Sequence, residues 1–138
     1  MPSPRTIQTL LGSIFLVLGG WALLFAADVE RLVLAPEHFV GTTASAVLMG
    51  CFGAQACLCA TVILTCRFTP LTFLAFGLVG SLPFFAFNFY FLYIEPIFTN
   101  WMYLDFVGNI GILSCGVLGW YAARQELAST QVHEHVQV

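Results

Sequence analysis

Four long stretches of apolar residues follow one another along this chain, with short polar segments between them. They cover about residues 6–27, 42–66, 71–93 and 101–123, and together they contain a single charged side chain. An α-helix rises about 1.5 Å per residue, so about 20 apolar residues cross a hydrocarbon core of about 30 Å. The pattern therefore predicts an all-α fold: an integral membrane, four-helix transmembrane bundle that forms a single domain over residues 1–138.

The composition also indicates a lipid environment. The chain is 59% hydrophobic and 8% charged, whereas soluble domains carry about 25% charged residues. A soluble chain of 138 residues would bury only about 60–70% of the surface that it exposes when unfolded. We therefore expect the lipid bilayer to cover the apolar surface. The chain has no Lys and four Arg, which leaves no basic patch to bind nucleic acid.

The first apolar stretch has a second interpretation, as a secretory signal peptide. The apolar core of a signal peptide spans about 7–15 residues and precedes a cleavage site with small residues. Residues 6–27 form a longer stretch, and cleavage after Ala27 would put Phe25 where a small residue is required. We therefore favour a retained membrane helix.

Residues 28–41 form the longest polar segment between the apolar stretches and hold more charged residues than either of the other two connections. One side of this segment is apolar at helical spacing: Val29, Leu32 and Val33. Glu30 and Arg31 lie off that side. Pro36 ends the pattern, because the residue before a proline avoids the helical conformation. A short amphipathic helix at the membrane interface and an ordinary solvated loop both fit this outer loop.

Two other features carry no predicted site. The five cysteines lack the spacing of a metal site or a disulfide framework, and they fit small packing residues inside helices. The polar C-terminal tail, residues 124–138, contains the group His133, Glu134 and His135, which is too short and too mobile to bind a metal. We expect a frayed or disordered tail, and neither a metal nor a cofactor in the protein.

The distribution of arginines predicts the orientation of the bundle. Four spans place both termini and the second loop on one side, which then carries Arg5, Arg67 and Arg124. The opposite side carries Arg31 alone. Because cytoplasmic segments are enriched in Arg and Lys, we expect both termini in the cytoplasm. No feature of the chain indicates which membrane holds it.

Three strongly polar side chains interrupt the apolar stretches on the opposite side: Asn88, Asp105 and Asn109. Asn88 and Asp105 lie roughly 6–7 Å below the outer ends of consecutive helices. Asn109 follows Asp105 by four residues and shares its helix face. An ionisable group inside a membrane is costly and often marks a functional site. We therefore expect the three side chains to converge in a ligand pocket walled by phenylalanines.

Structural roles explain the same three residues equally well. Asp105 would form an ion pair with Arg31, the one cation on its side, and clamp the outer loop onto the bundle. Such a pair predicts that Asp105→Asn and Arg31→Gln destabilise the protein to a similar degree. Pro83 predicts a kink in the third stretch, and Asn88 would then bond either the backbone carbonyl that the proline leaves free or the hydroxyl of a neighbour. Asn109 would bond a neighbouring helix. The structural and the ligand-binding interpretations both remain open.

Three features of the sequence carry a family resemblance. The glycine-bearing first stretch leads into RLVLAPE, from Arg31 to Glu37, and the second stretch is rich in small residues. The fourth stretch contains DFVGN, from Asp105 to Asn109. In these features the chain resembles the small four-span membrane proteins of the DoxX-like and DUF4345-like group. The resemblance implies the four-span bundle over nearly the whole chain and carries over no functional residue.

We expect a protein that is not an enzyme, because the sequence contains no nucleophile–base pair and no intramembrane His. It would be an accessory subunit, or it would bind a small apolar or lipid-like molecule in an outer-leaflet pocket. The alternative is a small membrane enzyme or an oligomeric transporter that uses Asp105, Asn109 and Asn88. Small residues recur in the second and fourth stretches, and they suit a homo-oligomer, a membrane-protein partner or packing within the bundle.

Overall fold

Helices make up nearly all of the regular structure in the computed structural model, which describes residues 2–136 and the side chains of residues 2–129. They are α1 (Pro4–Leu24), α2 (Ala26–Val33), α3 (Thr43–Thr65), α4 (Pro70–Val79), α5 (Leu82–Phe89) and α6 (Tyr103–Val136). A π-helical turn, Tyr90–Ile94, extends α5, and a 3₁₀ turn, Asn100–Met102, precedes α6. The predicted all-α fold is confirmed.

Side-chain caps explain where three of the long helices begin. The Thr42 hydroxyl accepts the Ser45 backbone N–H, and the Ser45 hydroxyl accepts the Thr42 N–H in return. Thr69 and Thr72 form the same reciprocal pair before α4, and Ser3 caps α1 through its hydroxyl. These bonds satisfy backbone donors that the first turn of a helix leaves unpaired.

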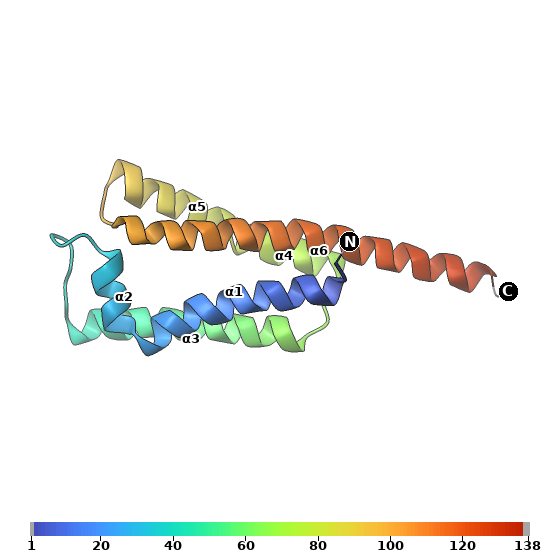
Figure 1. Cartoon of the computed structure of the whole chain (residues 1–138), viewed down its shortest axis with the longest axis horizontal. Coiled ribbons are helices and arrows are strands. Elements are labelled where there is room, and N and C mark those ends of the chain that lie inside the picture. The colour runs from blue at the N-terminus through green and yellow to red at the C-terminus, as the bar shows by residue number, and fades with distance from the viewer. Residues whose placement is uncertain (1, 137–138) are drawn as a thin grey trace.

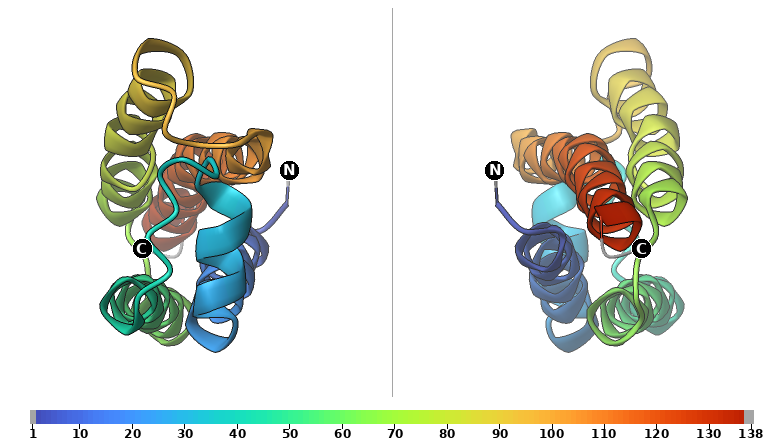
Figure 2. Two further views of the ribbon diagram at one scale, coloured as in Figure 1. Left: turned by 90° about the vertical axis from the view of Figure 1, so that its left-hand side faces the viewer. Right: turned by 90° about the vertical axis from the view of Figure 1, so that its right-hand side faces the viewer.

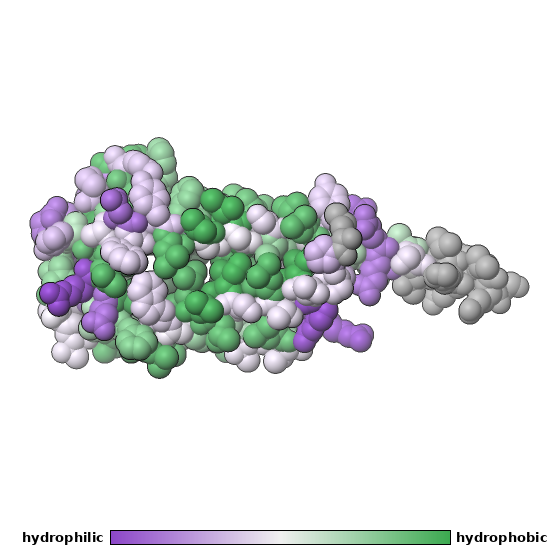
Figure 3. All heavy atoms as spheres, in the orientation of Figure 1, coloured by the Kyte–Doolittle hydropathy of each residue, from purple (hydrophilic) through white to green (hydrophobic). Residues whose placement is uncertain are grey.

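Four helical segments are long and apolar enough to cross a membrane: Pro4–Leu24, Thr43–Thr65, Pro70–Ile94 and Asn100–Ser129. They coincide with the four predicted stretches. On the face shown in Figure 3, apolar residues cover the middle of the bundle and hydrophilic residues gather at its two ends. These observations support an integral membrane protein in contact with lipid.

The helices run back and forth, so that both termini lie at one end of the bundle (Figure 1). The opposite end carries α2 and residues 95–99, and we call it the loop end. Seen along the bundle, α1 and α3 form one side, and α4, α5 and α6 form the other (Figure 2). Helix α1 packs along α3, and α4 packs along α6.

Glycines allow both helix pairs to approach closely. Gly53 of α3 faces the backbone of α1 at Gly19, and Gly116 of α6 faces the backbone of α4 at Gly77. A Cβ atom at Gly53 or Gly116 would overlap the partner backbone. At these positions the small residues of the second and fourth stretches therefore serve packing within the bundle.

The start of α1 covers the end of α3. The buried Gln8 amide donates to the Cys66 carbonyl at 2.7 Å and also to the Ile63 carbonyl. Arg5 donates to the Leu64 carbonyl at 2.9 Å. Three carbonyls from the end of α3 thus receive side-chain donors, and the last turn of a helix leaves such groups without partners in the helix.

The third span is interrupted where Pro83 predicts a kink. Helix α4 ends at Val79 and α5 begins at Leu82, and the Ser81 hydroxyl bonds the Gly77 carbonyl beside the break. Pro83 lies in the first turn of α5, where a missing backbone N–H costs no hydrogen bond. Helix α5 diverges from the line of α4 (Figure 1), which separates it from α1 and α3 at the loop end.

The segment of residues 28–41 contains a helix that lies across the loop end of the bundle (Figure 1). Helix α2 occupies most of its first half, as one of the two interpretations expected. Two backbone bonds of 2.8 Å tie its end to the second connection at the loop end, residues 95–99: the Ala35 N–H donates to the Ile97 carbonyl, and the Thr99 N–H donates to the Val33 carbonyl. The two connections at the loop end therefore form one cap over the bundle.

The polar tail differs from the expectation of a frayed or disordered segment. Helix α6 continues without interruption from the membrane span to Val136. The Arg124 guanidinium lies over the Trp120 ring, 4.9 Å from its centroid, and this contact joins the start of the tail to the span. The side chains of His133, Glu134 and His135 lie outside the described residues, as does the backbone of residues 137 and 138.

Candidate functional site

Asn88, Asp105 and Asn109 converge on one carboxylate oxygen. The Asn88 side-chain amide donates to Asp105 Oδ2 at 2.7 Å, and the Asn109 amide donates to the same oxygen at 2.7 Å. Asn88 belongs to α5, whereas Asp105 and Asn109 are one turn apart on α6. The structure therefore brings together the three residues that the sequence singled out.

This cluster is buried on one side and open on the other. Asn88 is fully buried and Asn109 is 3% exposed, whereas Asp105 is half-buried. Each amide donates to one of the two lone pairs of this oxygen, so the oxygen can accept both hydrogen bonds. Asn88 Oδ1 is buried without a hydrogen-bond partner in the described part of the chain. The two amides thus fix Asp105 through Oδ2 on the buried side. The open side of the carboxylate remains accessible to a ligand.

The predicted ion pair between Arg31 and Asp105 does not form among the described residues. Arg31 lies on the exposed side of α2, and Asp105 takes its hydrogen bonds from two asparagines. The physical reason is the rotation of α2, which turns Glu30 toward the bundle and Arg31 away from it. Backbone bonds of the cap, rather than an ion pair, hold the outer loop in place.

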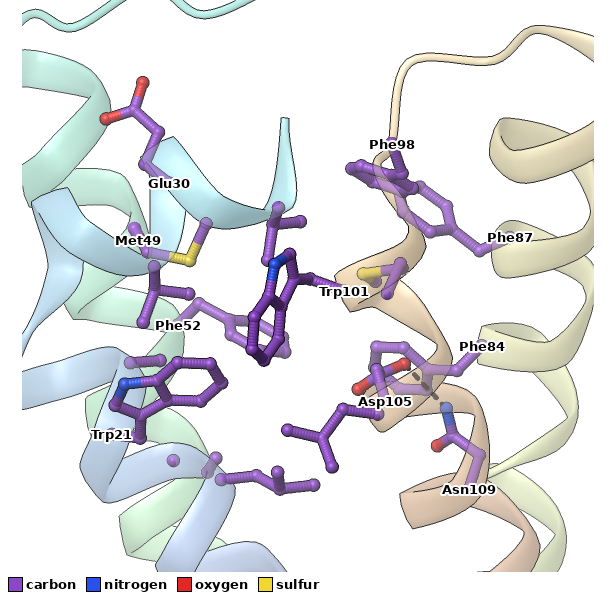
Figure 4. A pocket seen from close by; sticks show the side chains of 18 of the residues that line it. Trp21, Glu30, Met49, Phe52, Phe84, Phe87, Phe98, Trp101, Asp105 and Asn109 are labelled. Atoms are coloured by element: carbon purple, nitrogen blue, oxygen red, sulfur yellow. Dashed lines mark hydrogen bonds between the residues drawn. The ribbon is translucent and has the colours of Figure 1, made fainter. Parts of the chain in front are cut away.

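A cavity of about 610 Å³ opens beside the cluster, between the α1–α3 pair and the α5–α6 pair. Asp105 and Asn109 form part of one wall, and α2 closes the loop end. Aromatic rings supply much of the remaining wall (Figure 4): Trp21, Phe52, Phe84, Phe87, Phe98 and Trp101. Asn88 lies behind this wall and does not line the cavity. The cavity exists because α5 turns away from the direction of α4 at the helix break.

Glu30 is a cavity residue that the sequence interpretation missed. It is 3% exposed, it lines the cavity from α2, and its Oε1 accepts the Gly41 N–H at 3.4 Å. Helical spacing offered a signal, since Glu30 is four residues from Ala26 and three from Val33 and therefore shares their face. The prediction that Glu30, like Arg31, lies off the buried side of this helix was therefore wrong for Glu30.

The arrangement offers a binding site lined by apolar groups and a few polar ones. Among the described residues, no group of three His, Cys, Asp or Glu side chains is placed to hold a metal ion. The polar side chains that line the cavity are Glu30, Ser45, Asp105 and Asn109, and such groups can orient a ligand by hydrogen bonds. Comparisons with family models, with curated proteins and with solved structures found no match for this chain.

Proposed function

We propose that this protein is a non-enzymatic membrane bundle that binds a small apolar or lipid-like molecule in the cavity at its loop end. The cavity itself carries the proposal. Its volume of about 610 Å³ falls within the range of about 300–1,000 Å³ that is typical of small-molecule sites. Such sites combine mainly apolar and aromatic walls with a few placed polar groups, as this one does.

The orientation rule places the cavity in the outer leaflet. Arg5, Arg67 and Arg124 belong to the terminal end of the bundle, and the positive-inside rule assigns that end to the cytoplasm. The loop end then faces outward, with α2 and the outer connections between the cavity and the aqueous phase. A ligand would enter sideways from the outer leaflet or by movement of this cap.

The polar cluster would orient the ligand. Asp105 is the only charged side chain within the four predicted apolar stretches. Asn88 and Asn109 fix its position through two hydrogen bonds of 2.7 Å. A group whose direction is fixed by neighbouring donors loses little freedom when it binds a ligand. The apolar part of the ligand would contact the aromatic walls.

Native mass spectrometry of three forms of the purified protein tests this proposal. Met49 of α3 lines the cavity (Figure 4), and Met49→Trp would fill part of it. Val47 is exposed and does not line the cavity, so Val47→Trp is the matched control. After incubation with a total lipid extract, we expect a retained small molecule in the wild type and in Val47→Trp, with its loss in Met49→Trp. A wild-type protein that stays bare would contradict the proposal.

A further inference from the structure

The charges around the cavity are all of one sign. Glu30 and Asp105 are the two charged residues that line it, and no arginine or histidine does so in the part of the chain that the structure describes. Arg31 is exposed on the other side of α2. Arg5 bonds the end of α3, and Arg124 lies over Trp120, both at the terminal end. The cavity is therefore a negative site without a counter-ion from the described residues.

The two carboxylate oxygens of Asp105 differ in their hydrogen bonds. Oδ2 accepts both amide bonds, whereas Oδ1 accepts no hydrogen bond from the described residues. A carboxylate away from bulk water is costly unless a cation or further donors compensate it. The Asn88 and Asn109 amides supply two donors but no charge. A positive group at the open face of Asp105 would supply the missing opposite charge.

The aromatic walls suit the same kind of group. The rings of Trp101 and Phe84 lie on the side of the cavity that holds Asp105, and the Trp21 ring faces them from the opposite wall (Figure 4). The face of an aromatic ring attracts cations, tryptophan most strongly, and aromatic cages are a known means of recognising quaternary ammonium groups. The same rings also provide apolar surface for the rest of a ligand. Carboxylate and rings together favour a cation with an apolar body.

Other ligand classes fit the cavity less well. An anionic headgroup would meet Glu30 and Asp105 without a compensating cation. A bare metal ion would need more ligands than the site provides, since no group of three suitable side chains exists among the described residues. A purely apolar molecule would leave the Asp105 carboxylate without a counter-charge in a low-dielectric cavity.

We infer that the cavity binds an organic cation, an amine or quaternary ammonium group with an apolar body, and that the cationic nitrogen lies against Asp105. This inference rests on the proposed function, because it assumes that the cavity is a ligand site. Glu30 adds negative potential from the cap. The Phe52, Phe84 and Phe87 rings would contact the apolar body.

Three probes of one shape test the inference. The first is a phenylalkyl trimethylammonium ion, the second is the neutral hydrocarbon in which carbon replaces the nitrogen, and the third is a carboxylate of the same chain length. Equilibrium binding of radiolabelled probes is measured in a nonionic detergent. Binding that remains in Met49→Trp reports partition into the micelle and is subtracted. The proteins are the wild type, Asp105→Asn, Asp105→Glu and Glu30→Gln.

We expect the wild type to bind the cation at least about tenfold more tightly than the hydrocarbon, and to bind the carboxylate most weakly. Asp105→Asn should lose this preference while it still binds the hydrocarbon, which shows that the cavity is intact. Asp105→Glu should retain the preference. Glu30→Gln should reduce it by a smaller factor, and this variant keeps the test available if Asp105→Asn does not fold.

The failures of the two proposals are distinguishable. Equal binding of the hydrocarbon and the cation by the wild type, or a cation preference that persists in Asp105→Asn, would overturn the cation inference and leave the proposed function standing. Binding of all three probes that is no greater in the wild type than in Met49→Trp would overturn both.

Discussion

The side-chain amide of Asn88 on α5 donates to the carboxylate of Asp105 on α6 at 2.7 Å. This bond joins the two helices that meet at the loop end, and Asn109 donates to the same oxygen from one turn along α6. The buried Asn88 amide thus positions the half-buried Asp105 carboxylate, which lines the cavity. We refer to the two side chains and the cavity as one unit. The unit explains why polar residues persist in a chain that is otherwise apolar at this depth.

The Asn88 bond should contribute measurably to stability. Asn88→Leu removes one donor from a carboxylate, so we expect the free energy of unfolding in detergent to fall by about 1–2 kcal/mol. Phe89→Leu, at an exposed neighbouring position, should change it by less than about 0.5 kcal/mol. If Asn88→Leu were as stable as the wild type, the amide would not be supporting Asp105.

The contact between Gly77 and Gly116 should tolerate no added methyl group. A Cβ atom at Gly116 would overlap the α4 backbone, whereas a Cβ atom at Gly20 would meet nothing within 4 Å. We expect Gly116→Ala to lower the free energy of unfolding by about 1–3 kcal/mol through overpacking. Gly20→Ala should raise it by about 0.5–1 kcal/mol, because alanine favours the helix. Equal effects in reversible unfolding experiments would argue against the close α4–α6 approach.

Arg31 should be dispensable for stability. Its side chain is exposed and Asp105 takes its bonds from asparagines, so Arg31→Gln should change the free energy of unfolding by less than about 0.5 kcal/mol. Asp105→Asn should cost about 1 kcal/mol, because an amide accepts the two donors less strongly than a carboxylate does. Equal losses for the two variants in thermal unfolding would instead support the ion pair.

Cysteine labelling should report the orientation that we propose. His38 is exposed on the outer connection, and Cys66 is exposed at the opposite end of the bundle. A membrane-impermeant maleimide should label His38→Cys in intact cells and reach Cys66 only after permeabilisation. The same labelling in a Cys66→Ser background shows which labelled product comes from Cys66 and which from His38→Cys. Labelling of His38→Cys that requires permeabilisation would show that the loop end faces the cytoplasm.

The sequence by itself determined the four spans and the contents of the polar cluster. Hydropathy is a local property, and a helix in lipid must satisfy its own backbone bonds, so apolar stretches of sufficient length predict helices directly. Helical spacing placed Asp105 and Asn109 on one face. The link to Asn88 followed from similar depth on consecutive helices, which are commonly neighbours.

Only the tertiary structure decided which side chains meet across longer distances. The rotation of α2 brings Glu30, rather than Arg31, toward the bundle, because the turn after α1 and the bonds to residues 97–99 set its direction. The divergence of α5 opens the cavity, and close packing at Gly53 and Gly116 holds the helix pairs together. These features arise from contacts between segments that are distant in the chain, and local patterns of hydrophobicity do not encode the geometry of such contacts.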